Sequence, residues 1–134
     1  MLAATSIGRR CNVRLRLVAL VAVAGLVVVG IAAAVNAMAV PKLYGTVGPG
    51  YTISLKNAHG RAVRTLTPGK YTFIVKDKAN IHNFTLNGPG IRNKTITGTT
   101  FVGTKTVTVT LKKGTYRFYC TVHPTLVTGR FRVT

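Results

Sequence analysis

The sequence has almost no acidic side chains, and this shortage excludes several kinds of chemistry. Asp77 is the only carboxylate side chain among 134 residues, against 19 lysines and arginines. Catalysis by paired carboxylates needs two such groups, and calcium or magnesium sites usually need more than one. A serine triad would have to combine Asp77 with Ser6 or Ser54, the only serines in the chain. We therefore expect no enzymatic activity.

Sulfur-containing side chains are also few. The cysteines are Cys11 and Cys120, and the methionines are Met1 and Met38. Cys11 precedes a long apolar run, so Cys120 is the one thiol of the remaining chain. No intramolecular disulfide can form there, and a lone cysteine in an exported protein calls for another explanation.

The N-terminal segment has the composition of a targeting sequence. Residues 9–16 carry four arginines, and an uncharged run rich in Leu, Val and Ala follows. This order is typical of a signal peptide, and Ala37-Met38-Ala39 fits the small-residue cleavage pattern. The run is also long enough for an uncleaved membrane anchor. In both cases the arginines stay inside and residues 42–134 lie outside the membrane.

We therefore expect a leader over residues 1–39, acting as signal peptide or N-terminal membrane anchor, and one exported domain over residues 40–134. The domain would be extracellular, periplasmic or on the outer face of the cytoplasmic membrane. Four of the 19 basic residues lie in the leader, which leaves 15 against one acid, a net charge of +14. Such a surface attracts acidic partners. The cations are scattered along the chain, so an ordinary solvated surface is the alternative interpretation.

Apolar residues in the domain recur with period two, which indicates strands. Turn signals rich in Gly, Pro and Asn separate the segments. The strongest segments are residues 70–75, 105–111, 115–120 and 129–133, and the shorter ones are 43–47, 52–56, 63–66, 83–86 and 94–97. The pattern predicts an all-β fold, a Greek-key β-sandwich or barrel of seven to eight strands.

Two of the three histidines stand in positions that suit a metal site. His123 follows Cys120 by three residues at the end of a predicted strand, and His82 begins another strand. His59 precedes Gly60 in a turn and reads as a surface residue. One thiolate and two imidazoles suit copper in both oxidation states. The alternative is a buried structural thiol with two ordinary polar histidines.

Two motifs carry a resemblance to the plastocyanin-like cupredoxins, the type 1 blue copper family. They are His82-Asn83-Phe84, followed by Asn87-Gly88-Pro89-Gly90, and the run from Gly114 to Pro124 with Gly129-Arg130-Phe131-Arg132-Val133 behind it. The resemblance implies a cupredoxin-like fold and one copper ion held by His82, Cys120 and His123. It also implies that the peptide of Asn83 lies near the cysteine sulfur, and that the protein carries one electron between Cu(I) and Cu(II).

The sequence departs from the family at the axial ligand, which is usually a methionine after the second histidine. Alignment on Gly129 places Val127 at that position, and counting from His123 places Leu126 there. Neither side chain can bind copper. An apolar residue at this position favours Cu(I), so we expect a higher reduction potential than in a methionine-ligated relative.

Two other functions use the same residues differently. The first is copper storage, delivery or resistance with the same three ligands. The second is a metal-free β-sandwich that binds a wall polymer through its basic surface. For an electron carrier we expect an acidic redox partner, a monomeric state and no binding to nucleic acid, because export and the lack of a recognition motif argue against that ligand. Membrane contact is expected through the leader if it is not cleaved.

Overall fold

The structure of the protein is a computed structural model that describes residues 38–134. The arginines at 9–16, the apolar run and Cys11 lie outside the described residues, and so does the predicted signal peptide or anchor except for its last two residues. Within residues 38–134, no helix is long and apolar enough to cross a membrane.

The described part of the chain consists of strands and loops, with one strand at each segment where the alternation predicts one. The strands are β1 (Lys42–Val47), β2 (Ile53–Asn57), β3 (Thr65–Leu66), β4 (Gly69–Asp77), β5 (Phe84–Gly88), β6 (Ile91–Thr97), β7 (Gly103–Leu111), β8 (Gly114–Tyr119) and β9 (Thr128–Val133). The count is nine rather than seven to eight because β3, only two residues long, still pairs in parallel with β9.

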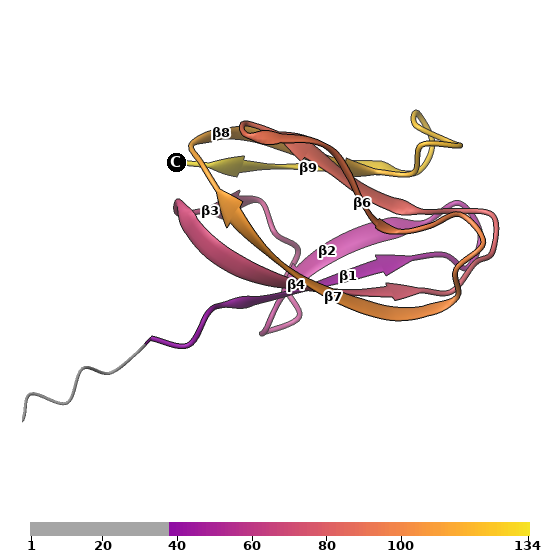
Figure 1. Ribbon diagram of the computed structural model, residues 1–134, viewed down its shortest axis with the longest axis horizontal. Coiled ribbons are helices and arrows are strands. Elements are labelled where there is room, and N and C mark those ends of the chain that lie inside the picture. The colour runs from indigo at the N-terminus through magenta and orange to yellow at the C-terminus, as the bar shows by residue number, and fades with distance from the viewer. Residues whose placement is uncertain (1–37) are drawn as a thin grey trace, which may run out of the picture. The chain divides into compact units, whose positions relative to one another are not determined.

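The strands form two sheets that pack face to face. One sheet has the order β2-β1-β4-β7 and the other the order β3-β9-β8-β5-β6. Figure 1 shows β1, β4 and β7 in one layer and β8 and β9 in the other. The chain crosses between the sheets five times, after β2, β3, β4, β6 and β7. This is the connectivity of a Greek-key sandwich, so the predicted fold class is confirmed.

The core reaches the start of β5, which His82 precedes by two residues, and the end of β8, which Cys120 follows directly. Phe84 and Phe118 are buried and stack with ring centroids 5.7 Å apart and planes 3° apart. The side chain of Cys120 points to the same face as that of Phe118, because side chains alternate along a strand with period two and Phe118 lies two residues earlier. Burying a phenylalanine contributes about 1.5–3 kcal/mol. The stacked rings therefore fix the two strand ends from which His82 and Cys120 are held.

Four loops gather at one end of the sandwich. β1 runs parallel to β4 with Val47 opposite Asp77, and Gly103 at the start of β7 lies opposite the same aspartate. In the other sheet, β5 and β9 start beside the ends of β6 and β8. This end, on the right in Figure 1, is called the loop end from here on. It consists of residues 48–52, 78–83, 98–102 and 120–127.

Candidate metal centre

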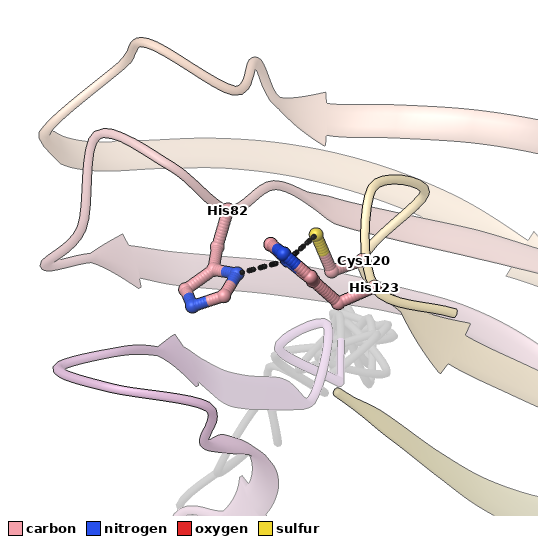
Figure 2. Close-up of side chains that lie close together, drawn as sticks. All are labelled: His82, Cys120 and His123. Carbon is pink, nitrogen blue, oxygen red and sulfur yellow. Dashed lines mark hydrogen bonds between the residues drawn. The ribbon is translucent and has the colours of Figure 1, made fainter. Parts of the chain in front are cut away.

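The three predicted ligands converge at the loop end. His82 comes from the loop before β5, Cys120 follows β8 directly, and His123 lies in the loop between β8 and β9. The Nδ1 atoms of the two histidines are 3.1 Å apart, and Nδ1 of His123 is 4.0 Å from Sγ of Cys120. The donor atoms of all three lie within 4.8 Å of one another. Figure 2 shows the three side chains pointing toward one another.

These separations fit a single metal ion held by three donors. Metal–nitrogen and metal–thiolate bonds in proteins are about 2.0 and 2.3 Å long. For a trigonal arrangement, bonds of this length place the two nitrogens about 3.5 Å apart and each nitrogen about 3.7 Å from the sulfur. The observed 3.1 and 4.0 Å differ from these values by a few tenths of an ångström, and the third pair, the donor atoms of His82 and Cys120, lies within 4.8 Å. Binding of a metal therefore requires these two donors to approach each other by about 1 Å or less.

Burial argues against the interpretation of His82 as an ordinary polar histidine. Cys120 and His82 are fully buried, and His123 is half-buried. Nε2 of His82 has no hydrogen-bond partner, one of two such buried side-chain atoms among residues 38–134. A buried imidazole is usually hydrogen-bonded, because an unpaired nitrogen costs free energy. Nδ1 of His82 lies at hydrogen-bond distance, 3.1 Å, from Nδ1 of His123 and faces the other two donors, so it is the nitrogen of His82 that could bind a metal.

Asn83 joins the loops that carry the ligands. Its backbone N–H donates a hydrogen bond to Sγ of Cys120 at 3.4 Å. Its side-chain oxygen accepts from the N–H of Thr121 at 2.9 Å, and its amide donates to the hydroxyls of Thr121 and Thr99 at 2.6 and 3.2 Å. The resemblance to the cupredoxins implied only the contact of the Asn83 peptide with the cysteine sulfur. The side-chain contacts were missed because Thr99 and Thr121 are 16 and 38 residues away.

The loop from Cys120 to Val127 is closed by its own backbone. The N–H of Cys120 donates to the carbonyl of Val127 at 2.9 Å, and the N–H of Val127 donates to the carbonyl of His123 at 2.9 Å. From outside the loop, the Arg117 guanidinium donates to the carbonyl of Pro124. These bonds hold Cys120 and His123 at a fixed separation.

Burial distinguishes the two residues considered for the axial position. Val127 is fully buried and belongs to the hydrophobic core, whereas Leu126 is 67% exposed. The neighbouring loop residue that turns inward is therefore Val127. His59, the third histidine, is exposed in the turn after β2, as its sequence context predicts.

One further residue contacts this site and was not singled out from the sequence. The ring of Tyr51 lies 5.3 Å from the ring of His82 and 5.0 Å from that of His123, centroid to centroid. In the sequence, Tyr51 follows Gly48-Pro49-Gly50, which indicates only a turn. No sequence signal links that turn to a histidine 31 residues further on.

Charge is distributed unevenly around the site. Lys78 is the only charged side chain in the four loops of the loop end, and the other 14 cations of residues 38–134 lie elsewhere on the domain. Exposed apolar side chains flank the histidines instead, namely Ile81 at 50%, Val122 at 51% and Leu126 at 67%. The surface nearest the ligands is thus apolar and almost uncharged.

No protein-family model and no curated protein matches the chain. Among solved structures, it is similar to auracyanin A, a "blue" copper protein from the green thermophilic photosynthetic bacterium Chloroflexus aurantiacus. The identity is 20%, the TM-score is 0.48, and the match covers 69% of this chain and 98% of that one. Rusticyanin from Thiobacillus ferrooxidans is 24% identical with a TM-score of 0.44, over 69% of this chain and 76% of that one. At this level of likeness, the roles of individual residues have to follow from the geometry of the site.

Proposed function

We propose that this chain is an exported type 1 blue copper protein that carries one electron at a time, with His82, Cys120 and His123 as copper ligands. The observation that supports this best is the meeting of one buried thiol and two imidazole Nδ1 atoms within 4.8 Å. Copper bound there supplies a one-electron Cu(I)/Cu(II) couple, which a thiolate and two imidazoles accommodate in both oxidation states.

The residues around the ligands limit their movement, which suits electron transfer. The hydrogen bonds of Asn83 tie the His82 loop to the Cys120 loop, and the closed backbone from Cys120 to Val127 fixes His123. Partners that orient the ligands in this way also tune the metal. A site whose ligands stay in place needs little reorganisation when its charge changes by one.

We place an apolar cap where the fourth ligand of the family would be. The one methionine among residues 38–134 is Met38, which is 92% exposed in the segment before β1. The fully buried Val127 belongs to the loop that holds Cys120 and His123. This three-ligand site favours Cu(I) and raises the reduction potential relative to a methionine-ligated site.

The electron would leave through His123, which is the ligand with solvent exposure. The exposed Val122 and Leu126 lie beside it and form an apolar contact surface. An acidic redox partner would be attracted by the net charge of the domain and would then dock on this apolar surface. The leader would place the domain outside the cytoplasm, either released or anchored.

An electron carrier exchanges electrons and keeps its copper, whereas a storage or delivery protein releases the copper. The experiment therefore measures the rate of electron exchange and the rate of copper loss. We expect the copper-loaded protein to exchange electrons with its own oxidised form much faster than it loses copper to a chelator. If copper leaves faster than electrons exchange, the storage or delivery function is correct instead. If the protein binds no copper, or if Cys120→Ser binds it unchanged, the copper site itself is wrong. His59→Ala is the matched control and should alter neither rate.

A further inference from the structure

We infer that Tyr51 is a lid on the candidate metal centre, and that its ring determines how fast metal ions and reagents reach His82 and His123. Its effect on copper rests on the proposed function, whereas its shielding of the histidines in the metal-free protein does not. Tyr51 is a positioning residue here, since it contacts the two imidazoles and supplies no donor atom.

Three aromatic rings pack edge to face at the mouth of the site. The planes of Tyr51 and His82 are 68° apart, those of Tyr51 and His123 are 86° apart, and those of the two histidines are 72° apart. Their centroids lie between 4.8 and 5.3 Å from one another. Edge-to-face contacts at such distances are favourable. One tyrosine therefore contacts both histidine ligands at once.

Tyr51 is the outermost of these rings. It is 58% exposed, while His82 beside it is completely buried although it lies in a loop. Part of the Tyr51 ring therefore covers the histidines, and the remainder faces solvent. A ring in this position blocks approach from one side and can rotate away without unfolding the strands.

The loop that carries Tyr51 is fixed at its base. The N–H of Gly48 donates to the carbonyl of Thr52 at 2.8 Å, and the N–H of Lys78 donates to the carbonyl of Val47 at 2.9 Å. Gly48 has a φ of 69°, and a Cβ there would lie 2.7 Å from Cβ of Ala79. The glycine thus permits close packing between the Tyr51 loop and the His82 loop. Opening of the lid therefore requires rotation of the tyrosine side chain rather than movement of the loop.

The first test uses the metal-free protein and the exposed His59 as an internal reference. Diethyl pyrocarbonate modifies accessible imidazoles, and peptide mass spectrometry reads each histidine separately. In the wild type we expect His59 to react fast and His82 and His123 to react slowly. Tyr51→Ala should raise the rate at His123 about tenfold, the size expected for the loss of edge-to-face contacts. An unchanged ratio of His123 to His59 reactivity would overturn the lid.

Three further variants distinguish the effect of the Tyr51 ring from the effect of its hydroxyl and from a general effect on folding. Tyr51→Phe should stay within about twofold of the wild type because the contacts are made by the ring. Tyr51→Leu should lie between Phe and Ala, and it serves as the test if Tyr51→Ala does not fold. Tyr44→Ala is the matched control, because Tyr44 is a half-exposed tyrosine on β1. If Tyr44→Ala accelerates the reaction as much as Tyr51→Ala, the effect is general and the lid is wrong.

The second test measures copper release to increasing concentrations of a chelator. If the lid must open first, the wild-type rate reaches a plateau, and Tyr51→Ala releases copper about tenfold faster with a plateau that is higher or absent. The thiolate absorption band should stay intact in the variant, because the ligands are unchanged. If the wild type and Tyr51→Ala release copper at the same rate and both keep the thiolate band, the lid is wrong but the copper site stands. If the wild type itself shows no thiolate band, the proposed function is wrong.

Discussion

The loop end and the rest of the domain differ sharply in charge. The four loops around the candidate metal centre hold one cation, Lys78, while the strands and the remaining turns hold 14. The loop end exposes Ile81, Val122 and Leu126 instead. Charged residues are depleted at the centres of protein interfaces, where they would lose water. Distant charge still speeds encounter, because its field extends about a Debye length into solution. The charged strands and turns can thus attract a partner from a distance, while the apolar loop end makes the contact with it.

The largest expected effect comes from Asn83, whose side chain binds two other loops of the loop end. Asn83→Ala leaves the N–H of Thr121 without its acceptor, so we expect a loss of about 1–3 kcal/mol in the free energy of unfolding. Copper affinity should fall about 10- to 100-fold, as for other groups that orient metal ligands. Chemical denaturation and copper titration measure the two quantities.

The matched control for this substitution lies on β5, away from the loop end. The side chain of Asn87 accepts one exposed hydrogen bond, from the N–H of Asn93 at 3.2 Å. Asn87→Ala should change stability by no more than about 0.5 kcal/mol and leave copper affinity unchanged. If both variants behave alike, the hydrogen bonds of Asn83 do not organise the site.

The second-largest effect is expected on the rate of electron transfer to a small acidic redox protein. Two substitutions separate the role of the apolar contact surface from that of the distant positive charges. Val122→Asp buries a charge on the contact surface and should slow electron transfer about tenfold even at 1 M salt, and more at low salt, where the new carboxylate also repels the acidic partner. Lys112→Gln removes a distant charge and should slow it about twofold at low salt and not at 1 M salt, where the Debye length is about 3 Å. Stopped-flow mixing measures both. A reversed pattern would place the docking surface elsewhere.

The smallest expected effect concerns the apolar cap. Val127→Met introduces a thioether on a buried side chain and should lower the reduction potential by about 30–60 mV, since 59 mV corresponds to a tenfold change in relative affinity. Leu126→Met is the control, because Leu126 is 67% exposed and should leave the potential unchanged. Protein-film voltammetry gives both values. If neither substitution lowers the potential, the axial argument is wrong.

The period-two alternation was sufficient to predict the sandwich, because each strand buries one face. The spacing of Cys120 and His123, together with His82, was sufficient to nominate the donors, and the structure places them together. Tyr51 and the side-chain role of Asn83 could not be predicted. Both depend on contacts between loops far apart in the sequence, and such contacts leave no local pattern. The choice between Leu126 and Val127 was open for a similar reason, since loop register decides which side chain turns inward.

The copper site is tested most directly by the visible and electron paramagnetic resonance spectra of the protein loaded with one equivalent of Cu(II). We expect the protein to bind one ion per chain and to show an intense thiolate-to-copper absorption band and the resonance of a type 1 site. Cys120→Ser should abolish the band, and His59→Ala should preserve it. A colourless wild-type protein, or one whose band survives Cys120→Ser, would contradict the claim that His82, Cys120 and His123 together hold copper.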